Sequence, residues 1–117
     1  TRKRRFLAKI LIENLNRNVK RMIPRSMLDT ENCVYYHFSI FVNTEIIEFQ
    51  SYLLKKGIDA VGYALPLNSD EKAFHQFNTN LPLAKKIKKE SVFLPIHEDY
   101  TENDIILMAK LVNEYFI

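Results

Sequence analysis

The segment Val34-Tyr-Tyr-His-Phe-Ser-Ile-Phe-Val42 is the clearest strand pattern in this chain of 117 residues. Successive side chains of a strand point to opposite sides, so the segment should have two distinct faces. The first face is uniformly hydrophobic and is expected on the core. Its members are Val34, Tyr36, Phe38, Ile40 and Val42. The second face is mixed, with Tyr35, His37, Ser39 and Phe41. Large aromatic rings are rarely left open to water, so we expect another part of the structure to cover it.

Helical patterns flank this strand. Residues 2–23 carry hydrophobic residues at three- and four-residue spacing and are expected to form one helix that Pro24 ends, with a polar loop over 24–32. The stripe consists of Leu7, Leu11, Leu15, Val19 and Met22, widened by Phe6, Ile10 and Ile23. After the strand, Asn43 and Thr44 are suitable helix caps. The helix that follows should end at Gly57, since glycine adopts positive φ at little cost.

The C-terminal half supplies two short strands and two more helices. The expected strands are residues 60–63 and 92–94, and a short helix should cover 82–89. Thr101 is an N-cap for the last helix, whose hydrophobic stripe is Ile105, Met108, Ala109, Val112 and Phe116. The irregular segment 64–80 is long for a compact domain, which is more typical of a functional loop than of a plain connection.

The order and length of these elements predict the fold class. Few, short strands favour a small, largely antiparallel sheet of about three strands with helices packed on it. This is an α/β protein of the α+β type, arranged as a two-layer sandwich. The length suits a single domain over residues 1–117, and 47% hydrophobic with 26% charged residues is typical of a globular chain.

Composition also limits the cellular context. No hydrophobic run approaches the roughly 20 residues that a membrane span needs, and no signal peptide is recognisable. The single Cys33 excludes an internal disulfide, which fits a cytoplasmic protein. Because the first residue is Thr1 rather than Met, we expect a fragment or a processed product.

Charge is distributed unevenly along the chain. Residues 1–25 hold nine Lys/Arg and one acid, a net of +8, whereas residues 26–117 hold eight Lys/Arg and thirteen acids, a net of −5. The run Arg2-Lys-Arg-Arg5 could bind nucleic acid or an anionic membrane. No aromatic residues interleave with the run for base stacking, which favours a solvated helix face or a contact with an acidic surface elsewhere in a parent protein.

Motifs that would identify a catalytic centre are missing. The chain has no glycine-rich phosphate loop, no Cys/His spacing for zinc or another metal, and no Gly-x-Ser-x-Gly elbow. The aromatic neighbours of His37 favour a packed or hydrogen-bonded ring over a substrate contact. His97 is expected to hydrogen-bond to the loop before the last helix, and His75 to be an exposed loop residue. Tyr63 ends a strand, from where its hydroxyl could reach a cleft.

Several segments together resemble one enzyme family. They are, in chain order, the strand Val34–Val42, the helix end Leu54-Lys-Lys-Gly-Ile-Asp, Leu81-Pro-Leu-Ala-Lys, Ser91-Val-Phe-Leu-Pro-Ile-His and Thr101-Glu-Asn-Asp-Ile. Each is weak alone, but their order and spacing are similar to those of the C-terminal small domain of the DegT/StrS family of PLP-dependent sugar aminotransferases.

The resemblance implies a fold like the small domain of fold-type I aminotransferases and a role in a larger enzyme. In that family the enzyme is a homodimer, and its large domain holds PLP on a lysine while an amino group passes to a nucleotide-linked keto-sugar. Such enzymes serve polysaccharide and cell-surface sugar synthesis. The small domain helps shape the sugar pocket, which makes Tyr63, His37 and Asn68 candidate substrate contacts. No catalytic or PLP-binding residue is expected in this chain, so it should not act alone.

Two other interpretations remain open. The chain could be a stand-alone α/β binding or regulatory module that dimerises through its sheet. It could also be a small basic nucleic-acid-binding domain that uses residues 2–25.

Overall fold

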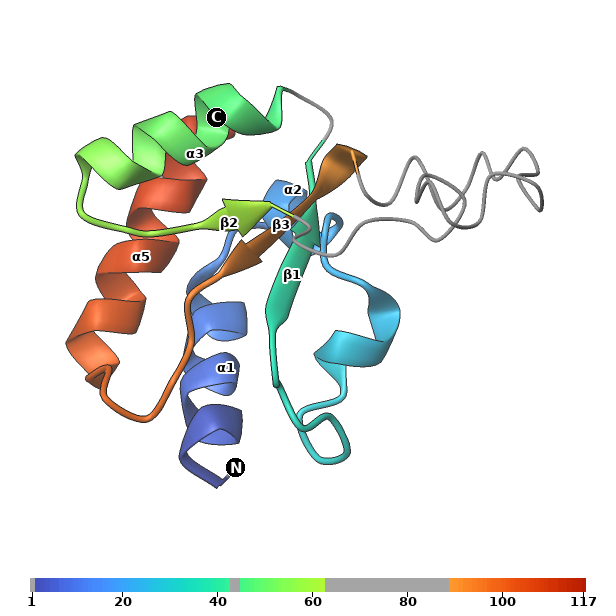
Figure 1. Ribbon diagram of the computed structural model, residues 1–117. Coiled ribbons are helices and arrows are strands. Elements are labelled where there is room, and N and C mark those ends of the chain that lie inside the picture. Colours follow the sequence, from blue (N-terminus) through green and yellow to red (C-terminus); the bar gives the residue numbers. More distant parts are fainter. Residues whose placement is uncertain (1, 43–44, 63–88) are drawn as a thin grey trace, which may run out of the picture.

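The computed structural model describes residues 2–42, 45–62 and 89–117 (Figure 1). The helical elements are α1 (Arg2–Asn14), α2 (Arg17–Lys20), the 3₁₀ helix η1 (Arg25–Leu28), α3 (Ile46–Lys55) and α5 (Glu102–Tyr115). The strands are β1 (Phe38–Phe41), β2 (Val61–Gly62) and β3 (Ser91–Leu94). No helix among the described residues is long and hydrophobic enough to cross a membrane.

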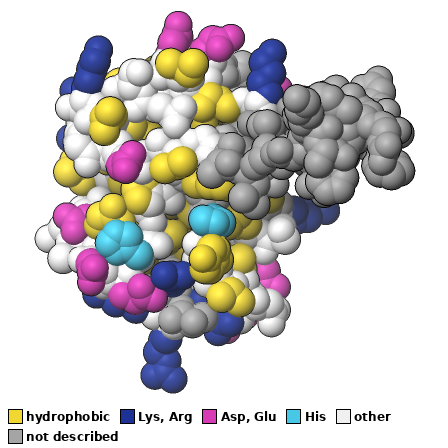
Figure 2. Space-filling view, viewed as in Figure 1, with side chains coloured by type: hydrophobic (Ala, Val, Ile, Leu, Met, Phe, Trp, Pro, Cys, Tyr) yellow, Lys and Arg dark blue, Asp and Glu magenta, His cyan; other side chains and the backbone are white. Residues whose placement is uncertain are grey.

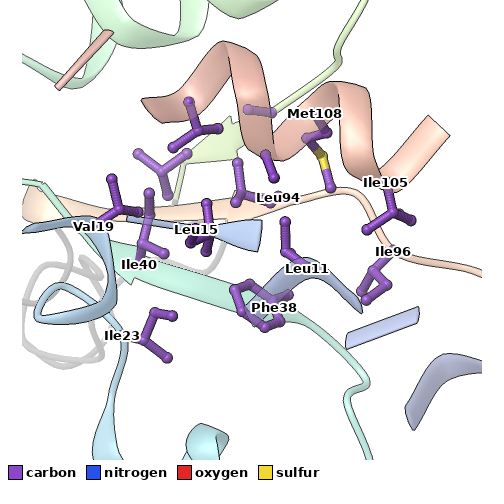
Figure 3. Packing of buried hydrophobic residues seen from close by; sticks show 14 of the residues in the cluster. Leu11, Leu15, Val19, Ile23, Phe38, Ile40, Leu94, Ile96, Ile105 and Met108 are labelled. Atoms are coloured by element: carbon purple, nitrogen blue, oxygen red, sulfur yellow. The ribbon is translucent and has the colours of Figure 1, made fainter. Parts of the chain in front are cut away.

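The three strands form one antiparallel sheet in the order β1-β3-β2. Phe38 pairs with Leu94 and Ile40 pairs with Val92, so these four side chains share a face of the sheet. All four are buried. Helices α1 and α5 lie side by side and pack on this face (Figures 1 and 3). The predicted α+β fold with a small antiparallel sheet and helices packed on it is therefore confirmed.

The helix stripes supply the rest of the core (Figure 3). From the N-terminal region the buried residues are Leu7, Ala8, Leu11, Leu15, Val19 and Ile23, and from α5 they are Ile105, Met108, Ala109, Leu111 and Val112. Both sets follow the spacing predicted from sequence, although Phe6 is half exposed rather than part of the stripe. Each fully buried Val, Leu, Ile or Met side chain among them contributes roughly 1.5–3 kcal/mol of hydrophobic stabilisation.

The prediction of one helix over residues 2–23 is wrong. Helix α1 ends at Asn14, and α2 starts again after Asn16, whose side-chain oxygen accepts from the Val19 amide at 2.9 Å. Asn113 on α5 holds the break from outside: its oxygen accepts from the Asn16 amide at 2.8 Å, and its nitrogen donates to the Asn14 carbonyl at 2.9 Å. Asparagine side chains compete with the helix for backbone groups, which ends the helix here rather than at Pro24.

The strand prediction for Val34–Val42 is correct only in its second half. Phe38, Ile40 and Val42 are buried as expected, but Val34 and Tyr36 are exposed and Tyr35 is buried. Tyr35 has a φ of +56°, which breaks the regular alternation of an extended chain. Its ring stacks on Phe38 with centroids 6.0 Å apart, and its hydroxyl donates to the Met27 carbonyl. The first three residues after Cys33 therefore point opposite to the prediction.

Local capping rules hold at the end of α3 and at the start of α5. Gly57 ends α3 with a φ of +88°, and the amides of Gly57 and Ile58 donate to the carbonyls of Leu54 and Leu53 at 3.0 and 2.8 Å, which is the Schellman pattern. Thr101 begins α5 through a capping box with Asp104. The predicted polar loop over 24–32 contains η1. The prediction that Asn43 or Thr44 caps α3 is wrong in position, because the N-cap residue is Glu45 and makes no side-chain capping hydrogen bond. Asn43 and Thr44 themselves, the loop over 64–80 and most of the helix over 82–89 lie outside the described residues.

Candidate functional site

The second face of the sheet carries a hollow of about 840 Å³. It is lined by Arg4, Tyr36, His37, Asp59, Val61, Phe93, Leu94, Pro95, Ile96 and His97. These residues come from the first turn of α1, the segment before β1, strand β2 and its approach, and the end of β3 with the loop after it. In Figure 2 both described histidines are visible on this side of the molecule, next to hydrophobic side chains. The tertiary fold thus gathers residues from four distant segments around one concave surface.

Aromatic side chains form a continuous series across the hollow. The His37 ring stacks on Phe93 with centroids 4.6 Å apart and an interplanar angle of 10°. Tyr36 meets His37 edge-on at 4.7 Å, and the Arg4 guanidinium lies 6.0 Å from the Tyr36 ring centre. The prediction that His37 is a packed ring is confirmed by its stacking on Phe93. His37 is nevertheless exposed, so a substrate contact through its other side stays a prediction.

Outside the hollow, the second face of the sheet is partly covered near Ser39 of β1. The Ser39 hydroxyl lies 3.3 Å from the sulfur of Met27, which places η1 against β1. The second face of the strand is therefore covered at Ser39, as expected, and the covering element is η1 of the same chain. Val61, opposite Phe93 in the β2–β3 pairing, is 45% exposed. Two exposed hydrophobic residues, Tyr36 and Val61, line the hollow on this side of the sheet.

Two of the four basic residues at the start of the chain are engaged within the fold. Arg4 Nε lies 3.0 Å from the Glu98 carboxylate, and Arg5 Nε donates to the Cys33 carbonyl at 3.0 Å. The pKa of Glu98 is lowered chiefly by a hydrogen bond from its own backbone amide, with help from the charge of Arg4. These contacts tie α1 to the rim of the hollow. They agree with a structural role for this part of the basic run.

His97 has the structural role predicted from its place in the sequence. Its Nδ1 accepts from the Asp99 amide at 3.3 Å, and its ring stacks on Tyr100 with centroids 4.1 Å apart. The His97 carbonyl accepts from the Tyr100 amide at 3.1 Å. These contacts shape the turn before α5 and hold one wall of the hollow.

Of the three substrate contacts predicted from sequence, the structure describes only His37. Tyr63 and Asn68 lie outside the described residues, as does His75. The hollow adds Tyr36, Val61 and Phe93, which sequence reasoning did not single out. Tyr36 was assigned to the core because a regular strand was assumed, and a positive φ at a tyrosine leaves no recognisable signal in the sequence.

The described lining of the hollow was also compared with the residue types that bind metals or PLP. Among the described residues no group of three or more His, Cys, Asp or Glu side chains could hold a metal ion. PLP enzymes bind their cofactor through a lysine Schiff base, and no lysine is among the described residues that line the hollow. The hollow combines aromatic side chains with Arg4, Asp59 and His97, and this combination is suited to binding a partner or ligand.

The chain is similar to a known protein family. The model of the DegT/DnrJ/EryC1/StrS aminotransferase family matches residues 1–112. No curated protein matches the chain significantly.

Proposed function

This chain belongs to the DegT/DnrJ/EryC1/StrS aminotransferase family, and we propose that it is the C-terminal small domain of an enzyme that aminates a nucleotide-linked keto-sugar. The observation that carries the proposal is the family match over residues 1–112, nearly the whole chain. The α+β architecture is consistent with a domain that accompanies a separate PLP-binding domain.

The chemistry of the proposed enzyme is divided between two domains. PLP, when bound by the large domain, supplies an electron sink for amino transfer. This chain contributes binding and shape: Tyr63, Asn68 and His37 are the proposed contacts of the sugar. His37 is available for such a contact because its ring is fixed by Phe93 and still exposed. The enzyme is proposed to be a cytoplasmic homodimer that serves polysaccharide or cell-surface sugar synthesis.

The test begins with the coding sequence upstream of Thr1. Expression of the complete polypeptide should give a protein with the visible absorbance of a PLP Schiff base and amino transfer to a keto-sugar nucleotide. The 117-residue chain alone, incubated with PLP and dialysed, should keep no coloured adduct. A complete polypeptide without a PLP-binding domain, or a stable adduct on the isolated chain, would contradict the proposal.

Substitutions in the complete enzyme test the sugar contacts. Tyr63→Phe and His37→Ala should change the kinetics of the sugar substrate while the melting temperature stays close to wild type. Ile47→Ala on the exposed side of α3 is a matched control, since this side chain is 74% exposed and is not among the described residues that line the hollow. Unchanged kinetics together with a large loss of thermal stability would assign both residues to folding instead.

A further inference from the structure

The outer face of α1 presents an aromatic ring among positive charges. Phe6 on this helix is 49% exposed. Residues three and four positions apart are neighbours on a helix surface. For Phe6 these neighbours are Arg2, Lys3, Lys9 and Ile10, so three of the four are cations. All three cations are exposed, and the ring is therefore surrounded by positive charge at the surface.

The packing of α1 explains why Phe6 faces outward. The helix buries Leu7, Ala8 and Leu11. At 3.6 residues per turn, Phe6 lies roughly 150° around the helix from the centre of this buried stripe. From sequence, Phe6 was placed in the stripe, and the basic run had no aromatic residue for base stacking. The structure supplies such a residue, because the ring is at the surface beside the basic side chains.

Little negative charge offsets the outer face of α1. Residues 2–12 hold five Lys/Arg and no acid. Of these five, only Arg4 forms an ion pair within the described part of the chain, and its partner is Glu98. The three cations around Phe6 form no ion pair with a described acid, so their charge is available to attract an anionic partner.

We propose that the outer face of α1 binds single-stranded nucleic acid, with a base stacked on Phe6 and phosphates beside Arg2, Lys3 and Lys9. Proteins that bind single strands combine cations along the backbone with aromatic rings on which bases stack. Unpaired bases are needed, because the bases of a duplex already stack on one another. The proposal goes beyond amino transfer and does not depend on it.

An anionic membrane fits this face less well. Amphipathic helices that lie on a membrane bury a whole hydrophobic face in the lipid. The hydrophobic face of α1 is already buried in the core, where the helix packs against α5. On the outer face, Phe6 is exposed and Ile10 is half-buried. One ring gives little hydrophobic area for insertion into lipid, but it is sufficient to stack a base.

Fluorescence anisotropy with labelled oligonucleotides tests the proposal in the complete polypeptide that contains this chain. Short single strands of mixed sequence should bind, with a Kd that rises steeply with salt, and parallel titrations with RNA and DNA identify the ligand. Phe6→Leu keeps a hydrophobic side chain without a ring and should weaken binding about tenfold, whereas Phe6→Tyr should bind like wild type. Lys9→Gln should reduce the slope of log K against log salt by about 0.7.

Two control variants change exposed residues of α5 instead. Leu107→Ala removes a hydrophobic side chain that is 54% exposed, close to the exposure of Phe6. Lys110→Gln removes one exposed positive charge, as Lys9→Gln does. Both controls should bind the oligonucleotides like wild type, and circular dichroism of every variant checks that the fold is retained.

Each other result overturns the proposal in a recognisable way. No binding of either RNA or DNA at low salt would exclude a nucleic-acid surface. Equal losses in Lys110→Gln and Lys9→Gln, or full binding by Phe6→Leu, would remove the site from the outer face of α1 or remove the stacked base. Binding to vesicles that contain phosphatidylserine, without binding to oligonucleotides, would assign the face to a membrane. The proposed amino transfer would stand in all of these cases.

Discussion

Replacing Tyr35 by phenylalanine isolates the contact that turns the chain before β1. Tyr35 is 1% exposed, and its hydroxyl donates to the Met27 carbonyl. The variant keeps the ring against Phe38 but leaves that carbonyl without its donor. A buried polar group left unpaired costs about 1–3 kcal/mol, and we expect a loss of about 1–2 kcal/mol because the carbonyl is only partly buried.

The neighbouring tyrosine provides the matched control. Tyr36 is 76% exposed, so Tyr36→Phe should change the free energy of unfolding by no more than about 0.5 kcal/mol. Urea denaturation of both variants measures the difference, and for a chain of this size Tyr35→Phe should lower the melting temperature by about 4–10 °C. If Tyr35→Phe and Tyr36→Phe unfold at the same urea concentration, the hydrogen bond to Met27 does not support the turn.

The same residue predicts an effect of alkaline pH. Burial raises the pKa of Tyr35 from 10 to about 12. Between these values the unfolded chain binds fewer protons at this position than the folded chain, so the free energy of unfolding falls as pH rises. Phenylalanine has no such proton, and the advantage of the wild type over Tyr35→Phe should shrink from pH 10 to pH 12. A constant difference across this range would contradict the assignment. Burial also raises the pKa of Tyr52 and Tyr100, so part of the decline is expected to remain in the variant.

Three further substitutions test the local structure, each by its free energy of unfolding in urea. Gly57→Ala should cost about 1–2 kcal/mol because φ is +88°, whereas Gly62→Ala, whose new Cβ would lie 3.8 Å from its neighbours, should stay within about 0.5 kcal/mol of wild type; equal effects would contradict the backbone argument. Thr101→Ala should cost about 1 kcal/mol through loss of the capping box, and Thr101→Ser should restore it. Asn113→Ala should cost about 1–2 kcal/mol because it removes two hydrogen bonds at the break between α1 and α2, and a neutral result would mean that the break needs no support from α5.

Helix capping and hydrophobic periodicity could be interpreted correctly from sequence. Gly57 and Thr101 end and begin their helices as predicted, and the stripe on α5 is buried from Ile105 to Val112. These features depend on residues within one or two helical turns, so the information is present in the local sequence. The small antiparallel sheet followed from the number and length of the strands.

The candidate site was predicted only in part. The sequence predicts a packed ring for His37, and this is confirmed. Its partner Phe93 is 56 residues away in the sequence and could not be identified from spacing. Tyr36 was placed on the wrong side because strand alternation was extended through Tyr35. The hollow depends on that reversal, since it brings Tyr36 to the open side of the sheet beside His37, which the alternation had already placed there.

The amino-acid sequence by itself determined the caps at Gly57 and Thr101, the buried stripes, the fold class and the resemblance to the aminotransferase family, because each of these depends on neighbouring residues or on their order. Only the tertiary structure decided where the first helix breaks, which way Tyr35 points and which residues surround the hollow. The physical reason is that these features depend on contacts such as those of Asn113 with Asn16, and of Tyr35 with Met27, whose energies exist only after distant segments have packed together.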